Sequence, residues 1–550
     1  MRKKLTAAFL AALTLGTASC SQIPKQPAPM NYAATPAMTS LSTNTASGYL
    51  GAISGDKAKD DEIWAFAEKL YNEWYARYQE ITSKTDPVID KIVDDDAEYS
   101  TRVEVASNVG KPFLSRKTRL LVTLKNFTPA SENVKTDVYG GFKIESMKQE
   151  VRGVFYTTQI DGRWWFIDPL GYPFYMVGVS RMGIEDGGAK NQKDPALAIY
   201  GSKEKWAIAA VKKLKNMGFN SCTRLSTAEL ETVEENLNYQ IGLGFLDNYE
   251  ISIGTKDTDT ASGSTLLKQG MHVFDPGFVD FCNNRMKQRV RNNTFINNPN
   301  LVGYTTDNEI PVDDKKMGLV LNLTLDITNT DVNYYSYAAA WTFLAHMAGK
   351  ENPTLDDAND AKLKEIFRGY VYDRYFAVVT NAIRRYDDKH LILGCRALNG
   401  ARTSEWICRA SGYWCDVVTF NWYHDWTPDA TVLQKISAWT NKPILITEYY
   451  AKAEECEGNL GNTSGAGWYV HTQKERGMFY QNFTLQLLES KNVVGWHWFQ
   501  YIDADPAAFG QKAANKGIYS NTHKEYTDLT DYMIPLNENI YGLIRHFDAK

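Results

Sequence analysis

The most informative segment of the chain for its fold is Leu301-Val-Gly-Tyr-Thr-Thr-Asp-Asn-Glu-Ile310. A compact apolar run, typical of a buried parallel strand, ends here on Asn308 and Glu309. A second run, Pro443-Ile-Leu-Ile-Thr-Glu-Tyr-Tyr450, has the same form and ends on Glu448. Because burying a carboxylate directly after an apolar strand is costly, both strand ends indicate a chemical role for their glutamates.

Six further apolar runs have the length of buried strands, and helical periodicity separates several of them. The eight candidate strands are Phe174–Ser180, Phe219–Leu225, Gly244–Tyr249, Val302–Asp307, Leu391–Arg396, Val417–Trp422, Pro443–Thr447 and Val493–Trp498. The candidate helices are Lys203–Asn216, Phe281–Asn292, Asp360–Arg385 and Lys474–Glu489. This alternation predicts an α/β fold, and eight strands predict a (β/α)8 TIM barrel. The alternative, an open doubly wound sheet, lacks a GxGxxG turn after its first strand.

The residues before the first of these strands follow other patterns. Apolar residues recur at helical spacing over residues 60–81, where Asp60 is placed to cap a helix. Short alternating runs broken by Pro and Gly follow over residues 102–158. We therefore expect an N-terminal helix and a small β-rich accessory region over residues 56–160, and the catalytic barrel over residues 161–550.

The N-terminus has the pattern of an export signal. Met1–Lys4 carries positive charges, and the apolar run Leu5–Leu15 is too short to span a bilayer. Small residues then precede Cys20, which resembles a bacterial lipobox with a lipidated cysteine; an ordinary cleaved signal is the alternative. We expect a lipoprotein signal peptide over residues 1–20 and a flexible tether over residues 21–55. The expected location is the outer membrane of a Gram-negative cell, on its periplasmic or surface face.

Bulk composition excludes some partners. A net charge of −5 and a pI near 6.0 provide no basic field for nucleic acid, and they argue against a strongly anionic substrate held by charge alone. Aromatic residues make up 13% of the chain, and their flat faces and polar tips suit sugar rings, although most of them fill the core. Trp426 and Trp468, in loops, are candidates for sugar subsites or for surface packing.

The two glutamates fit one reaction type in particular. Retaining glycoside hydrolysis needs one carboxylic acid that protonates the leaving oxygen and one carboxylate that attacks the anomeric carbon, about 5–5.5 Å apart. In an eight-stranded barrel the ends of strands four and seven, which carry Glu309 and Glu448, face each other across the mouth. The pair therefore predicts a glycosidase.

Asn-Glu ending strand four, with a second Glu ending strand seven, resembles the signature of the retaining glycoside hydrolases of clan A. The resemblance implies that Glu309 is the acid/base, that Glu448 is the nucleophile and that Asn308 hydrogen-bonds the 2-hydroxyl group of the sugar. Either motif alone is weak, because a lone Glu after a strand is more often a helix cap or an ion-pair partner. The signal is strong only as a pair in register with eight strands.

Other strand ends fit the same resemblance. Arg224 ends strand two, where clan members often place an arginine that hydrogen-bonds the nucleophile; a structural ion pair is the alternative. Tyr423 ends strand six, where a tyrosine commonly touches the nucleophile. In strand eight, Trp498 or Trp496 is the candidate platform beneath the substrate, and His497 between them is a further candidate for substrate binding. Alternation directs both tryptophans to one face, so one of them is a candidate for core packing.

A closer likeness lies in Asp161-Gly-Arg-Trp-Trp-Phe-Ile-Asp-Pro-Leu-Gly-Tyr-Pro-Phe-Tyr175. It resembles the passage through which β-agarases of glycoside hydrolase family 50 lead from a β-sandwich region into the barrel, and Gly303–Glu309 is similar to their acid/base strand. The resemblance spans about residues 150–510 and implies cleavage of β-glycosidic bonds in an agarose-like polysaccharide or oligosaccharide by double displacement. In two departures, the preceding β region is shorter, and Thr447–Lys452 does not match their nucleophile segment.

Three alternatives stay open. A β-galactosidase, β-glucanase or porphyran-type hydrolase of the same clan differs only in the sugar, and a non-catalytic surface glycan-binding lipoprotein would not need both glutamates. A metal-dependent hydrolase has little support, because the 8 His residues form no HExxH or His-x-His motif, and no cofactor is expected. Among the six cysteines after Cys20, Cys408 and Cys415 are close enough in sequence for a disulfide.

Overall fold

The computed structural model describes residues 53–87, 89, 97–129, 134–184, 190–223, 233, 236–258, 265–267, 271–291, 295–325, 327, 332–458 and 460–549. The predicted signal peptide, its lipidation site Cys20 and almost all of the predicted tether lie outside the described residues, and so does Arg224. Within the described part of the chain, no helix combines the length and the apolar character needed to cross a membrane.

The centre of the molecule is a sheet of eight parallel strands. In their order of pairing they are β12 (Leu391–Ile392), β11 (Leu301–Thr305), β8 (Asn238–Gly242), β7 (Ser221–Thr223), β6 (Met176–Ser180), β17 (Val493–Phe499), β14 (Ile444–Tyr449) and β13 (Val418–Asn421). Seven of them overlap the predicted strands. The parallel sheet is therefore predictable from the apolar runs.

The predicted closed (β/α)8 barrel is wrong, because the sheet is open. Its outer strands β12 and β13 form no ladder with each other and meet in the isolated bridge between Ala397 and Phe420. The cause is local. Gly394 and Arg396 have positive φ angles of 75° and 52°, which interrupt the extended conformation after Ile392. β12 is consequently two residues long and cannot complete a barrel.

The third predicted strand, Gly244–Tyr249, is also wrong, since these residues begin helix α5 (Phe245–Ser252) and the strand β8 precedes them. The carboxylate of Asp307, which follows β11, accepts hydrogen bonds from the backbone N–H groups of Leu246 (3.0 Å) and Asp247 (3.3 Å). This distant side chain caps the helix. A short apolar run suits a strand or a buried helix, and the long-range cap favours the helix.

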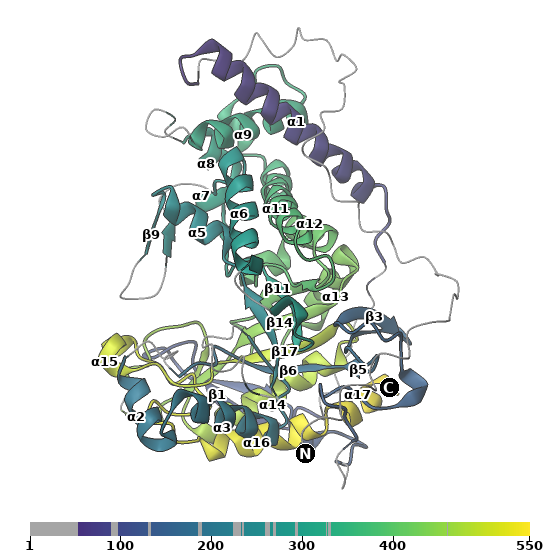
Figure 1. Cartoon of the computed structure of the whole chain (residues 1–550), viewed down its shortest axis with the longest axis vertical. Coiled ribbons are helices and arrows are strands. Elements are labelled where there is room, and N and C mark those ends of the chain that lie inside the picture. The colour runs from purple at the N-terminus through teal and green to yellow at the C-terminus, as the bar shows by residue number, and fades with distance from the viewer. Residues whose placement is uncertain are drawn as a thin grey trace, which may run out of the picture. The chain divides into compact units, whose positions relative to one another are not determined.

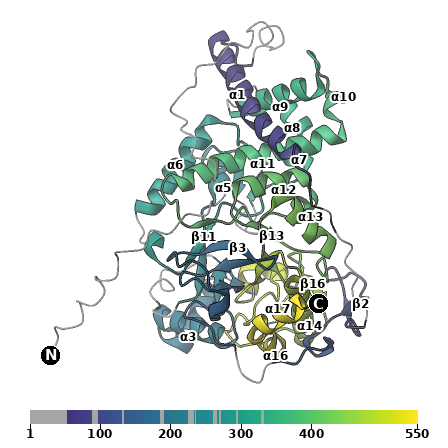
Figure 2. The ribbon, with the colours of Figure 1, turned by 90° about the vertical axis from the view of Figure 1, so that its right-hand side faces the viewer.

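Helices lie on both sides of the strands. Besides α5, the described helices are α1 (Lys57–Thr82), α2 (Lys190–Tyr200), α3 (Lys203–Asn216), α6 (Pro276–Arg291), α7 (Asp314–Met317), α8 (Leu319–Leu323), α9 (Val332–Ala348), α10 (Leu355–Ala358), α11 (Ala361–Arg384), α12 (Glu405–Trp414), α13 (Ala430–Thr440), α14 (Gln473–Glu489), α15 (Pro506–Phe509), α16 (Thr527–Glu538) and α17 (Ile540–Asp548). In Figures 1 and 2, α5, α6, α11 and α12 lie above the strands, and α3, α14, α16 and α17 lie below them.

An apolar cluster fills the amino-terminal ends of the sheet strands. It comprises Phe155, Phe166, Phe174, Met176, Val302, Leu391, Leu393, Val417, Leu445 and Val494. Phe166 and Phe174 belong to a small antiparallel sheet formed by β3 (Tyr156–Ile160), β4 (Arg163–Ile167) and β5 (Pro173–Phe174). Because this end is packed with apolar side chains, polar chemistry is left to the opposite, carboxyl-terminal end.

The N-terminal helix α1 matches the predicted helix, although its cap is Asp56, whose carboxylate accepts from the N–H of Ala58 (2.9 Å). Arg77 of α1 donates to Asp373 of α11 (3.1 Å), which fixes the helix on the sheet domain. Within the predicted β-rich region over residues 102–158, Leu121–Thr123 form a short 3₁₀ turn rather than a strand. The remaining short strands are β1 (Thr101–Val105) paired with β2 (Leu114–Thr118), β9 (Lys256–Thr258) with β10 (Thr265–Leu267), and β15 (Ala451–Ala453) with β16 (Trp468–Val470).

The cysteines of the described residues are all unpaired, so the disulfide considered between Cys408 and Cys415 is not formed. Both are buried, and the Cys408 thiol donates to the backbone oxygen of Ala401 (3.3 Å). No group of three or more His, Cys, Asp or Glu side chains in the described ranges is arranged to hold a metal ion.

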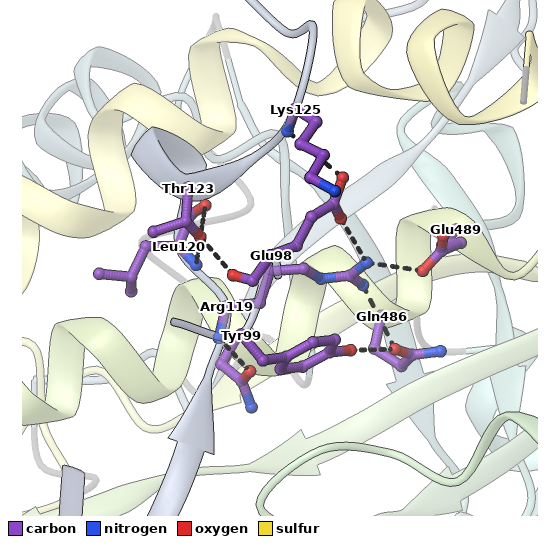
Figure 3. A network of polar contacts seen from close by, with 9 residues as sticks. Glu98, Tyr99, Arg119, Leu120, Thr123, Lys125, Gln486 and Glu489 are labelled. Carbon is purple, nitrogen blue, oxygen red and sulfur yellow. Dashed lines mark hydrogen bonds and ion pairs between the residues drawn. The ribbon is translucent and has the colours of Figure 1, made fainter. Parts of the chain in front are cut away.

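Arg119, directly after β2, connects the β1–β2 hairpin to α14 (Figure 3). Its guanidinium forms ion pairs with Glu98 (3.3 Å) and with Glu489 at the end of α14 (2.8 Å), and it donates to Gln486 (3.3 Å). Its backbone N–H donates to the side chain of Asn482 (2.7 Å). Because Arg119 is 2% exposed, this network holds the hairpin firmly on the helix.

Replacing Arg119 by alanine should destabilise the protein, because it removes the guanidinium from the buried carboxylate of Glu98. We expect the free energy of unfolding, measured by urea denaturation, to fall by about 3 kcal/mol. The control is Arg152→Ala, which removes a solvent-exposed ion pair with Glu150 and should cost less than about 1 kcal/mol. Equal losses for the two variants would contradict a structural role for the network.

Candidate active site

Glu309 and Glu448 both lie at the carboxyl-terminal end of the sheet. Glu448 lies in β14, and Glu309 follows the end of β11. β11 and β14 are each second from an edge of the sheet, and the two edges meet at the Ala397–Phe420 bridge. The curled sheet therefore brings the two glutamates near each other, and the charge of Glu448 contributes to a raised pKa of Glu309.

Asn421, the last residue of β13, connects the two glutamate segments. Its side-chain amide donates to the Glu309 carboxyl group (2.8 Å) and to the side-chain oxygen of Asn308 (3.3 Å). Its own side-chain oxygen accepts from the hydroxyl of Thr447 (2.8 Å), the residue before Glu448. Asn421 is also the register partner of Glu448. One amide side chain thus orients both segments.

The Glu448 carboxylate is buried, with 7% of the residue exposed, and two donors face it. The guanidinium of Arg396 forms an ion pair with one oxygen, and the hydroxyl of Tyr423 donates to the other (2.6 Å). The backbone of Arg396 is fixed by a hydrogen bond from its N–H to the side chain of Thr419 (2.9 Å). Charge-assisted bonds of this kind offset the desolvation of a buried anion and hold it in one orientation.

Glu309 has a different environment. Burial raises the pKa of its carboxyl group to about 7, and the charge of Glu448 adds to the increase. The hydrogen bond from Asn421 and the positive charges of Arg396 and Lys516 oppose it. A carboxyl group with this pKa still carries a proton in much of the population at neutral pH, as a general acid must.

A lysine and two aromatic rings lie beside the glutamates. The ammonium group of Lys516 is 5.3 Å from the ring centre of Tyr450 and 5.4 Å from that of Phe499. Burial lowers the pKa of Lys516 to about 8, and the charges of Glu448 and Glu309 oppose the decrease. Phe499 ends β17 and Tyr450 follows β14, so this wall comes from the same end of the sheet as the carboxyl groups.

The structure does not bring the predicted tryptophans to the glutamates. Trp498 is fully buried, its indole N–H donates to the backbone oxygen of Lys516 (3.0 Å), and its ring packs against Tyr480 of α14. Trp496 is also fully buried and donates to the Tyr480 hydroxyl (3.0 Å). Both side chains therefore face α14, and the aromatic residue of this strand that lies at the site is Phe499.

His497 lies inside the sheet with no exposed surface. Its Nε2 is 3.4 Å from the Ser221 hydroxyl oxygen, and a Cβ on Gly178 would meet its ring at 2.1 Å, so the glycine makes room for the imidazole. Burial lowers the pKa of His497 to about 3, and the charge of Arg396 adds to the decrease. The neutral ring is thus enclosed between Ser221 and Gly178 and has no surface that a sugar could reach.

The sequence does not single out Arg396, Asn421 or Lys516. Arg396 and Asn421 both lie at the ends of predicted strands, and this position could have identified them as candidate site residues. Lys516 lies in a loop after β17 and has no pattern that identifies it. Arg396 forms an ion pair with Glu448, whereas Arg224, for which the resemblance implies a hydrogen bond to the nucleophile, lies outside the described residues.

Sequence comparison relates the chain to two curated β-agarases of Vibrio sp. (strain JT0107), while no family model matches it. β-Agarase A is 24% identical over 470 residues, which is 70% of this chain and 45% of that protein. β-Agarase B is 22% identical over 488 residues, which is 74% of this chain and 50% of that protein. The chain therefore spans about half the length of the curated relatives it matches.

Solved structures give the same relation. The crystal structure of BpGH50 matches with a TM-score of 0.69 and 27% identity, over 84% of this chain and 100% of that chain. The agarase AgWH50C matches in fold with a TM-score of 0.58 and 20% identity, over 74% of this chain and 66% of that chain. The chain is thus β-agarase-like in sequence and in fold, in keeping with its predicted resemblance to family 50.

The raised pKa of Glu309 predicts a pH-dependent effect on stability. The folded state holds this proton more tightly than the unfolded state, whose carboxyl group titrates near 4.5, so stability is lost as the pH rises through about 7. Glu309→Gln mimics the protonated group and should raise the free energy of unfolding by about 2 kcal/mol at pH 8, with little effect at pH 4. Urea denaturation at both pH values measures this difference.

The control for that measurement is Glu351→Gln, at an exposed position, which should change the stability little at either pH. If the Glu309→Gln protein were no more stable than the parent at pH 8, ionisation of Glu309 would not destabilise the folded state, and the prediction would be wrong.

Proposed function

We propose that the protein is a retaining glycoside hydrolase that cleaves β-glycosidic bonds in an agarose-like galactan. The observation that carries this proposal is the unequal pair of carboxyl groups at one end of the sheet. Glu448 is ion-paired with Arg396, whereas burial raises the pKa of Glu309 to about 7. One ionised and one protonated carboxyl group are what the double-displacement reaction uses.

In the first step the Glu448 carboxylate attacks the anomeric carbon while Glu309 gives its proton to the departing glycosidic oxygen. The products are a covalent glycosyl–enzyme and the departing part of the sugar chain, which now carries a free hydroxyl group. In the second step Glu309 takes a proton from water, the water oxygen attacks the anomeric carbon, and the bond to Glu448 breaks. Burial and the charge of Glu448 raise the pKa of Tyr423 well above its ordinary value, so its hydroxyl stays a donor to the nucleophile.

The change in the role of Glu309 between the two steps follows from the same electrostatics. The charge of Glu448 contributes to the raised pKa of Glu309, and that charge disappears when the glycosyl bond forms. The pKa of Glu309 therefore falls in the intermediate, while the positive charges of Arg396 and Lys516 persist. An ionised Glu309 can then act as the base toward water.

The sugar is proposed from the relatives, which are named β-agarases or agarases. Phe499, which is 9% exposed, and the half-buried Lys516 lie next to the carboxyl groups and offer an apolar edge and a hydrogen-bond donor to a hydroxylated ring. We assign Asn308, whose side chain contacts Asn421, to the 2-hydroxyl group of the sugar.

Replacing Glu448 by glutamine should lower the turnover of agar oligosaccharides by at least about 1,000-fold, because the amide cannot attack the anomeric carbon. Glu454→Gln, at a half-exposed carboxylate, is the control and should keep the parent rate. Turnover is followed by release of reducing ends. NMR of the first product should show the β anomer, and an inverted product would exclude Glu448 as nucleophile. A parent protein that binds the oligosaccharide without turnover would be a glycan-binding protein.

We also propose that the exported protein is lipidated at Cys20 and anchored to a membrane, on the basis of the pattern over residues 1–20. In a bacterial host, Cys20→Ser should move the full chain from the detergent-soluble membrane fraction to the aqueous fraction. Cys456→Ser, an unpaired cysteine elsewhere in the chain, is the matched control and should stay in the membrane fraction. Mass spectrometry of the N-terminal peptide that shows no lipid would contradict the proposal.

A further inference from the structure

A cavity of about 310 Å³ opens beside the carboxyl-terminal end of β13. Its walls include Arg116 and Lys117 of β2, His424 and Asp425 of the loop after β13, and Trp468 of β16. This volume is at the lower limit of small-molecule sites and suits one sugar residue with a substituent.

The cavity lies next to the glutamates. His424 directly follows Tyr423, whose hydroxyl is bonded to Glu448. On the opposite wall, Trp468 is the parallel register partner of Ala451, three residues after Glu448. Two walls of the cavity therefore continue the two strand ends that hold the nucleophile, and a sugar chain at the glutamates would reach the cavity within a few residues.

The charge in the cavity is positive. The guanidinium of Arg116 lies 5.6 Å from the centre of the Trp468 ring and forms no ion pair with a described residue. The negative charge of Asp425 is compensated, because its carboxylate accepts from the guanidinium of Arg402 (2.7 Å) and from the indole of Trp422 (2.7 Å). The cavity thus combines the aromatic ring of Trp468 with the guanidinium of Arg116, and Lys117 belongs to its lining, although the whole chain carries −5.

The β1–β2 hairpin that carries Arg116 and Lys117 is held in place. The residue after Lys117, Thr118, is fully buried and accepts a hydrogen bond from the indole of Trp426 (3.0 Å). The next residue, Arg119, carries the ion pair to Glu489 of α14 that Figure 3 shows. Arg116 and Lys117 therefore extend from a fixed backbone over the loop after β13 rather than from a free surface segment.

We propose that this cavity is a subsite for a sugar residue that carries an anionic group, a sulfate ester or a carboxylate. A neutral agarose residue offers no charge to the guanidinium of Arg116, whereas a guanidinium on a rigid support binds planar or tetrahedral oxyanions through paired N–H groups. Trp468 supplies the face for the ring of the same residue. The substrate class is then a galactan with charged substituents, and this assignment rests on the proposed glycosidase function.

The test measures binding by calorimetry on the full chain with Glu448→Gln, so that no ligand is consumed. The probes are size-matched agar-type tetrasaccharides that are neutral, sulfated or carboxylated. We expect at least one anionic probe to bind about tenfold more tightly than the neutral one, with a preference that weakens at high salt. In the double variant Arg116→Gln/Lys117→Gln this preference should disappear, while affinity for the neutral probe stays unchanged. Comparing the affinities for the sulfated and the carboxylated tetrasaccharide shows which anionic group the cavity binds.

The matched control is Lys111→Gln, which removes one charge from the same hairpin outside the cavity and should keep the preference. Equal affinities for neutral and both anionic probes, or a preference that survives in the double variant, would overturn the subsite. Failure of the proposed function is seen separately, as absence of turnover of every probe by the parent protein. The binding preference on the Glu448→Gln chain tests the subsite in either case.

Discussion

Burial of the Glu448 carboxylate is the constraint on which the rest of the site depends. An anion with 7% of its residue exposed needs donors that do not move away, and the protein supplies a guanidinium and a phenol. The guanidinium belongs to Arg396, whose positive φ of 52° is incompatible with a continued β12 strand. The sheet therefore stays open where it would otherwise close, and the interrupted strand delivers the cation to the carboxylate.

The pKa of the Glu309 carboxyl group depends in part on the charge of Glu448. Glu309 receives an amide donor from Asn421 rather than a full ion pair, so burial and the charge of Glu448 dominate its pKa. Because Asn421 also accepts from Thr447, one side chain sets the position of both glutamate segments. Two residues of the same type thus take opposite roles through their surroundings alone.

Parts of the chain far from the glutamates determine where the site lies and which segments surround it. The apolar cluster at the amino-terminal ends of the strands leaves only one end of the sheet for polar chemistry. The buried ion pairs of Arg119 fix the β1–β2 hairpin on α14, and through it Arg116 and Lys117 reach the loop after β13. The β1–β2 hairpin therefore forms part of the wall of the cavity beside the loop after β13.

Apolar periodicity predicts the parallel strands, the main helices and the two glutamates at strand ends, because buried strands are continuous apolar runs and a carboxylate after such a run is conspicuous. The folded chain adds that Arg396 pairs with Glu448, that Trp498 faces α14, that Gly244–Tyr249 begins a helix and that the sheet stays open. These outcomes depend on contacts between residues far apart in the chain and on positive φ angles at Gly394 and Arg396. Local periodicity carries information about neither.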